Sequence, residues 1–98
     1  MTEAQVEKKL VTFCREHGLL TYKFASPSHR GVPDRIIMGG GKVLFVELKR
    51  PGKKPTTLQQ YEINRIIGAG HVAFWSDDWG AIKDQLFRIF TAVLHDGI

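Results

Sequence analysis

Two carboxylates and one ammonium lie at spacings that could bring them to a single phosphate group. Asp34 follows Pro33, and thirteen residues later the chain reads Glu47-Leu48-Lys49. Because side chains alternate along a strand, Glu47 and Lys49 emerge on the same side. If Asp34 begins the neighbouring strand of a hairpin, all three charged side chains converge at one end of the sheet.

Such a group suits phosphodiester hydrolysis, which needs charge neutralisation at the phosphoryl oxygens, a polarised water and a stabilised leaving group. Mg²⁺ or Mn²⁺ supplies all three and prefers hard oxygen ligands. The pattern predicts Asp34 and Glu47 as metal ligands, joined by the main-chain carbonyl of Leu48. Lys49 would orient or help deprotonate the attacking water. The alternative is a solvent-facing pair of strand residues and a turn aspartate, and these residues alone leave both interpretations open.

Apolar periodicity, helix-capping residues and glycines predict seven elements. They are a helix over 2–17, strands over 19–24, 34–38 and 42–48, a helix from Thr56 or Thr57 to about Ile67, a strand over 71–75, and a helix over 79–94 capped by Asp77 or Asp78. Three glycines at 39–41 favour an antiparallel hairpin between the second and third strands. The order α-β-β-β-α-β-α predicts the α/β fold class, with a mixed central sheet flanked by helices.

The last predicted helix carries a wider apolar arc than one small sheet needs. The arc comprises Trp79, Ile82, Leu86, Ile89, Phe90, Val93 and Leu94. A chain of 98 residues builds one domain with only a modest core, and dimerisation is a common remedy. Part of this arc is therefore a candidate dimer surface, and a homodimer is expected.

Glu7 is a third carboxylate that could serve the site. It lies one turn inside the first helix, at the margin of the apolar stripe beside Val11 and Cys14. A carboxylate in that position needs a partner or a cation. We therefore expect Glu7 to be a metal ligand or to support one, with Glu3 in the first turn as the alternative.

Gln59 is a candidate because of the helical face on which it lies. The spacing places it on one face with Ile63, Ile66 and Ile67, whereas Gln60 lies off that face. Its amide could bond the active-site lysine, a water or a phosphate. A partly satisfied amide at the edge of the core is the competing interpretation.

The charge balance favours a polyanionic partner. Fourteen Lys and Arg face ten Asp and Glu, for a formal net charge of +4. Basic side chains flank the proposed site in sequence and could grip the DNA backbone without reading bases. They are His29, Arg30, Arg35, Arg50, Lys53 and Lys54. A solubilising surface is the alternative for each of them.

The cysteine content and the hydropathy of the chain limit its expected cellular location. The single cysteine, Cys14, allows no intrachain disulfide and no thiolate zinc finger. The first ten residues carry charges and no apolar signal core, and no apolar run approaches the roughly 20 residues of a membrane span. We expect a cytoplasmic protein with no membrane partner.

The motifs resemble those of the virus-type replication-repair nuclease family, the VRR-NUC domain. The matching pieces are Glu7-Lys8-Lys9-Leu10, Lys23-Phe24-Ala25-Ser26-Pro27, Gly31-Val32-Pro33-Asp34-Arg35, Val46-Glu47-Leu48-Lys49, Leu58-Gln59 and Gly70-His71-Val72. The match runs from about residue 3 to 75, with the C-terminal helix beyond it. The resemblance implies a single VRR-NUC domain over 1–98.

This resemblance implies a restriction-endonuclease-like core of the PD-(D/E)xK superfamily and Mg²⁺- or Mn²⁺-dependent cleavage of DNA. The family's helical glutamate corresponds to Glu7, its aspartate to Asp34, its ExK pair to Glu47 and Lys49, and its glutamine to Gln59. Members of this length are similar to phage-encoded, homodimeric Holliday-junction resolvases that serve DNA repair. The implied setting is then the cytoplasm of a bacterial host, and the implied substrate is branched DNA.

Two other classes of function compete with a nuclease. A non-catalytic DNA-binding module on the same fold would bind DNA in a salt-sensitive way and cleave nothing. A small dimeric interaction protein would use the apolar face of 79–94 and show no DNA affinity at physiological salt.

Overall fold

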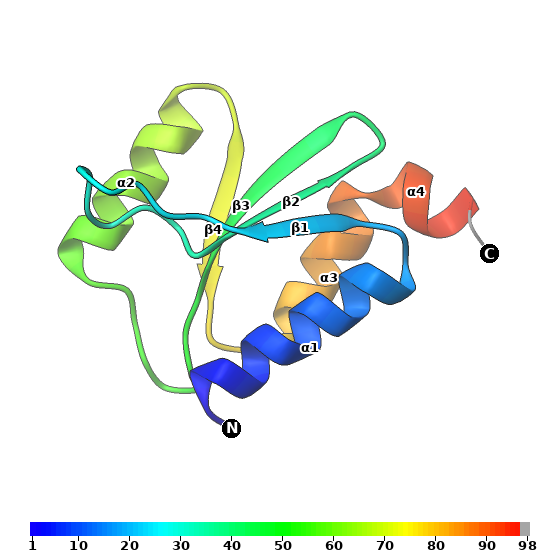
Figure 1. The fold of residues 1–98 in the computed structure, drawn as a ribbon, viewed down its shortest axis with the longest axis horizontal. Coiled ribbons are helices and arrows are strands. Elements are labelled where there is room, and N and C mark those ends of the chain that lie inside the picture. The colour runs from blue at the N-terminus through cyan, green and yellow to red at the C-terminus, as the bar shows by residue number, and fades with distance from the viewer. Residues whose placement is uncertain (97–98) are drawn as a thin grey trace.

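The computed structural model describes residues 1–96, built around a four-stranded mixed sheet (Figure 1). The strands are β1 (Leu20–Lys23), β2 (Arg35–Gly39), β3 (Lys42–Leu48) and β4 (Val72–Ser76), in the spatial order β1-β2-β3-β4. The pairs β1–β2 and β2–β3 are antiparallel, and β3–β4 is parallel. The predicted hairpin therefore occupies the middle of the sheet. Gly40 and Gly41 form its turn with φ of 55° and 79°, values that favour glycine.

The helices are α1 (Glu3–Glu16), α2 (Thr57–Gly68), α3 (Trp79–Ile89) and α4 (Thr91–Asp96). Side chains cap the first three at their N-termini. Thr2 and Thr56 each form a reciprocal capping box with the glutamine three residues on, and Asp78 accepts a hydrogen bond from the Ala81 N–H. Within residues 1–96, no helix combines the length and the apolar character that crossing a bilayer requires.

The two sides of the sheet are covered by different helices. Ile37, Leu44 and Val46 are fully buried in a core with residues of α1 and α3. On the opposite side α2 packs against β4, where Ala73 is buried. Residues that are neighbours in sequence along β3 therefore meet different environments, and Glu47 lies on the side of α2.

The predicted last helix breaks after Ile89, and the prediction of one continuous helix to 94 is wrong. Phe90 ends α3 with φ −102° and ψ 33°. The Thr91 hydroxyl donates to the main-chain carbonyls of Phe87 and Arg88, which competes with continued helical bonding. The change of direction lets Phe90 and Leu94 both enter the core.

Much of the apolar arc that was expected to form a dimer surface is used inside the protomer. Ile82 and Leu86 are fully buried, and Phe90 and Leu94 nearly so. Trp79, Ile89 and Val93 are partly buried against the same core. The arc is wide because it packs on both α1 and the sheet, so its width alone does not argue for a second subunit.

The buried face of α2 differs from the apolar face that the sequence predicted. Ile63 is buried, but Ile67 is 51% exposed and Glu62 is only 6% exposed. The buried Glu62 carboxylate is paired with His29 at 2.9 Å and with Arg65 at 3.4 Å. A buried carboxylate with two such side-chain partners can occupy a position that hydropathy assigns to an apolar residue.

The loop that leads into β2 rests on the first turn of α2 and should be sensitive to added bulk. Gly31 and Gly18 both have positive φ, 87° and 71°. A Cβ at Gly31 would lie 2.8 Å from the Leu58 side chain, whereas one at Gly18 would meet nothing within 4 Å. Gly18→Ala should cost about 1 kcal/mol from its backbone conformation alone. Gly31→Ala should cost roughly 1–3 kcal/mol more because Leu58 must move.

Urea unfolding of the two variants measures this difference. Equal losses would show that the loop does not depend on its contact with Leu58.

Candidate active site

The structure brings Asp34, Glu47 and Lys49 together at one end of the hairpin. Asp34 Oδ2 accepts a hydrogen bond of 3.1 Å from the Leu48 N–H, which joins the start of β2 to the end of β3. The register pairs Arg35 with Val46, so the next pair outward is Asp34 with Glu47. Lys49 Nζ lies 3.3 Å from Glu47 Oε2.

Main-chain contacts hold these side chains in place beyond the end of the strand. The Lys49 N–H donates to the Ser76 carbonyl at 3.0 Å and so extends the β3–β4 pairing by one residue. The segment that follows is anchored where the Gly52 N–H donates to Asp77 Oδ2 at 2.8 Å. The lysine is therefore part of the rigid sheet rather than of the following loop.

The Glu47 carboxylate is almost completely buried, and one of its oxygens has no hydrogen-bond partner among residues 1–96. The residue is 2% exposed, and the oxygen in question is Oε1. Burial is the main cause that raises its pKa to about 7, and the charge of Asp34 raises it further. The hydrogen bond and charge of Lys49 oppose the shift, and Glu3 adds a small contribution upward. Two like charges at short range disfavour ionisation of both groups, which is why Asp34 favours the neutral form of Glu47.

These residues fit a divalent cation of the Mg²⁺ type. The two carboxylates, one of which has a buried oxygen with no hydrogen-bond partner within residues 1–96, form a hard oxygen donor set. The described part of the chain has no cluster of three or more His, Cys, Asp or Glu side chains around one point. That is compatible with Mg²⁺, which often takes one or two carboxylates and keeps several waters.

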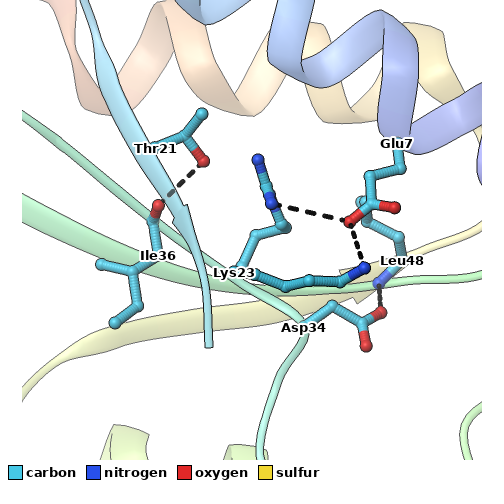
Figure 2. A network of polar contacts seen from close by, with 7 residues as sticks. Glu7, Thr21, Lys23, Asp34, Ile36 and Leu48 are labelled. Carbon is cyan, nitrogen blue, oxygen red and sulfur yellow. Dashed lines mark hydrogen bonds and ion pairs between the residues drawn. The ribbon is translucent and has the colours of Figure 1, made fainter. Parts of the chain in front are cut away.

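Glu7 lies beside this site, but its carboxylate forms ion pairs with two basic side chains of the protein. Its Oε2 is 3.8 Å from Lys23 Nζ and 3.7 Å from a guanidinium nitrogen of Arg35. Figure 2 shows the Glu7 carboxylate reaching from α1 towards Lys23, with Asp34 and Leu48 close by. A hollow of about 100 Å³ is lined by Glu3, Glu7, Lys23, Asp34 and Leu48. The contacts of Glu7 suit a residue that shapes the site, and Glu3 borders the same hollow.

Arg35 was expected among the residues that grip DNA, but the structure buries it. It is 9% exposed and pairs with Glu7, and its Nε has no hydrogen-bond partner within the described chain. The physical reason is strand alternation, because Arg35 lies on the same side of β2 as the buried Ile37, facing α1. Its charge lies against Glu7 rather than on the exposed surface.

The other predicted basic residues are on the surface. Arg30, Arg50, Lys53 and Lys54 are exposed. His29 is also exposed, with its Nε2 2.9 Å from the buried carboxylate of Glu62. Neither Glu62 nor the pairing of Lys23 with Glu7 was expected from the sequence. Lys23 is the register partner of Arg35 in the β1–β2 pair, which places both cations on the side of Glu7.

Gln59 has a structural task at the start of α2. Its Oε1 accepts a hydrogen bond of 2.9 Å from the Thr56 N–H, and its own N–H donates to Thr56 Oγ1. Its hydrogen bonds within the described structure are those of the capping box, and none joins it to Lys49. The Thr-x-x-Gln spacing is the signature of such a box and was a sufficient signal for this role.

Comparison with known proteins gives the fold and the family. A solved structure described as "VRR_NUC domain" matches with a TM-score of 0.78 and 25% identity, covering 90% of this chain and 97% of that chain. A second, described as "VRR_NUC domain protein", matches with a TM-score of 0.69 and 18% identity, covering 91% and 90%. No family model matches the chain. The mixed sheet and the order α-β-β-β-α-β-α are therefore those of the VRR-NUC nuclease fold.

A related phage protein supports the assignment to a family. "Putative nuclease p44" of Acyrthosiphon pisum secondary endosymbiont phage 1 is 49% identical over 70 residues, which covers 70% of this chain and 75% of that protein. The chain belongs to the VRR-NUC family and is a phage-type member of it.

The raised pKa of Glu47 predicts how stability depends on pH without metal. Its folded pKa of about 7 lies above the ordinary value of 4.5. The stabilising effect of the bound proton is therefore complete below about pH 4.5 and is lost as the pH rises to about 7. The loss should be about 3 kcal/mol at most. Urea unfolding in EDTA at about pH 5 and pH 8 measures it.

Glu47→Gln serves as the control, because it cannot release this proton. It should remove most of the fall between the two pH values. A variant that loses stability over that range as steeply as the unmodified protein would assign the effect to another group.

Proposed function

We propose that this protein is a metal-dependent, structure-selective DNA endonuclease of the PD-(D/E)xK type. It hydrolyses phosphodiester bonds in branched DNA such as Holliday junctions and works as a homodimer. The observation that carries the proposal is the buried Glu47 carboxylate, which lies next to Asp34 and 3.3 Å from Lys49. Two repelling carboxylates beside one lysine destabilise the metal-free protein, and a cation relieves that cost.

Asp34 and Glu47 would hold Mg²⁺ or Mn²⁺, with the main-chain carbonyl of Leu48 as a further oxygen. The ion supplies charge neutralisation at the phosphate and a lowered pKa for a bound water. The Leu48 N–H fixes the orientation of Asp34 by its hydrogen bond to Oδ2. Lys49 donates hydrogen bonds to the attacking water and to a phosphoryl oxygen, and its burial strengthens both.

The surface supports DNA as the substrate. Arg50, Lys53 and Lys54 are exposed on the segment that follows Lys49, where they meet the DNA backbone next to the cleaved bond. The similarity to a protein named as a nuclease agrees with this activity. In a homodimer, two such sites related by twofold symmetry face opposite strands of a junction and suit paired nicking.

Junction cleavage tests the catalytic assignment. Four-way junction, flap and linear duplex DNA are incubated with Mg²⁺, Mn²⁺ or EDTA, and the protein's size is measured by sedimentation. Cleavage should require the metal, favour branched DNA, and fall at least about a hundredfold in Asp34→Asn and Lys49→Ala. Lys83→Ala, an exposed substitution on α3, should cleave normally.

Three results would contradict the proposal in different ways. Cleavage that survives Asp34→Asn or Lys49→Ala would place the site elsewhere. Linear duplex cut as fast as junctions would remove the structure selectivity. Salt-sensitive binding with no product under any divalent ion would identify a non-catalytic DNA-binding module instead.

The salt dependence of DNA affinity tests the proposed contacts between the basic side chains and the DNA backbone. Arg50→Ala and Lys53→Ala should each weaken binding and lower the slope of log affinity against log salt by about 0.9. Arg35→Ala should leave that slope unchanged and lower stability, because its guanidinium is buried against Glu7. A reduced slope in Arg35→Ala, with the other two unchanged, would reverse the assignment.

A further inference from the structure

Next to the carboxylate site, a cavity opens between the start of α2 and the end of β4. Its volume is about 500 Å³, and its lining includes Lys54, Thr57, Gln60, Tyr61, Asn64 and Trp75. Figure 1 shows α2 alongside β4, with the segment from β3 arriving at its first turn. Gln60, Tyr61, Asn64 and Trp75 have no part in the proposed metal site.

The cavity begins one strand away from the proposed metal site. Trp75 is the register partner of Glu47 in the parallel β3–β4 pair. Register partners project from the same side of a sheet, and neighbouring strands are about 4.8 Å apart. Successive nucleotides of a strand are roughly 3.4 Å apart along a duplex. DNA bound at Glu47 therefore reaches this cavity within about one or two nucleotides.

Two aromatic rings in the cavity can stack on a planar ligand. Tyr61 is 56% exposed, and Trp75 is half-buried. Arg65, which lies outside the lining of this cavity, is 5.8 Å from the centre of the Tyr61 ring. Base stacking on such rings contributes roughly 1–3 kcal/mol per base and does not depend on sequence.

Two amides beside the rings offer hydrogen bonds of both kinds. Gln60 Nε2 donates to Asn64 Oδ1 at 3.0 Å. This bond orients both amides and leaves Gln60 Oε1 as an acceptor and Asn64 Nδ2 as a donor with no partner in residues 1–96. An adjacent donor and acceptor match the edge of a nucleobase. Lys54, at the same cavity, supplies a positive charge for the attached phosphate.

We propose that this cavity binds an unpaired nucleobase of the DNA strand, adjacent to the phosphate that the carboxylate site cleaves. The inference rests on the proposed nuclease function and adds the recognition of single-stranded or unstacked DNA to it. A base inside a duplex is stacked on both faces and cannot reach Tyr61 or Trp75 without being unstacked. The cavity thus gives one protomer a physical basis for preferring branched DNA.

The test uses a short single-stranded oligodeoxynucleotide with the protein in EDTA, so that binding is measured without cleavage. A Trp79→Phe background leaves Trp75 as the remaining tryptophan, and its fluorescence should be quenched on binding. Tyr61→Ala should weaken this binding roughly tenfold, whereas Tyr61→Phe, which keeps the ring, should restore it. Affinity for a blunt duplex should change by less than about twofold in Tyr61→Ala, since a paired base does not enter.

An oligonucleotide made only of abasic sites keeps the phosphates and removes the bases. It should bind weakly and be insensitive to Tyr61→Ala. If Tyr61→Ala weakened duplex, single-stranded and abasic DNA alike, the cavity would be a backbone contact, and the inference would be overturned. Unchanged affinity for all three, or no quenching of Trp75, would also overturn it.

The outcomes separate this inference from the proposed nuclease function. Asp34→Asn should still bind the oligonucleotide and quench Trp75, with the same dependence on Tyr61. Binding with these properties in a protein that cleaves no DNA would keep the base site and reject the nuclease. Cleavage without any dependence of single-strand affinity on Tyr61 would keep the nuclease and reject the base site.

Discussion

The structure depends on one constraint, which is the burial of the Glu47 carboxylate at the end of β3. An ionised carboxylate that is 2% exposed is costly unless charges and hydrogen bonds compensate it. Lys49, two residues on, compensates in part, and Asp34 works against it. The β2–β3 hairpin positions both of these side chains beside Glu47. The pairing of the two central strands therefore determines the charges that surround the buried carboxylate.

A second ionic group holds α1 against the same end of the sheet. Glu7 on α1 pairs with Lys23 of β1 and with the nearly buried Arg35 of β2. These contacts join one helix to two strands directly beside Asp34. Because breaking a partly buried pair leaves an uncompensated charge, this group resists separation of α1 from the hairpin. The sheet end is thus fixed by ion pairs on both sides of Asp34.

Strand alternation explains both the successful and the failed predictions about the site. It correctly predicted that Glu47 and Lys49 share a side, because that follows from the two-residue period alone. The same period put Arg35 on the side of Ile37, yet only the packing of α1 over that side made the arginine buried. Likewise Glu62 is buried because His29 from a distant loop meets it, and no local pattern of α2 contains that information.

By itself the sequence determined the order of the elements, the glycine turn of the hairpin, the helix caps and the common side of Glu47 and Lys49. These features depend on contacts within a few residues or on the period of one strand. The tertiary structure alone decided which charges are buried, where the last helix breaks, and that Trp75 lies beside Glu47. Those outcomes depend on segments distant in sequence, since the energy of a buried charge is set by whatever packs around it.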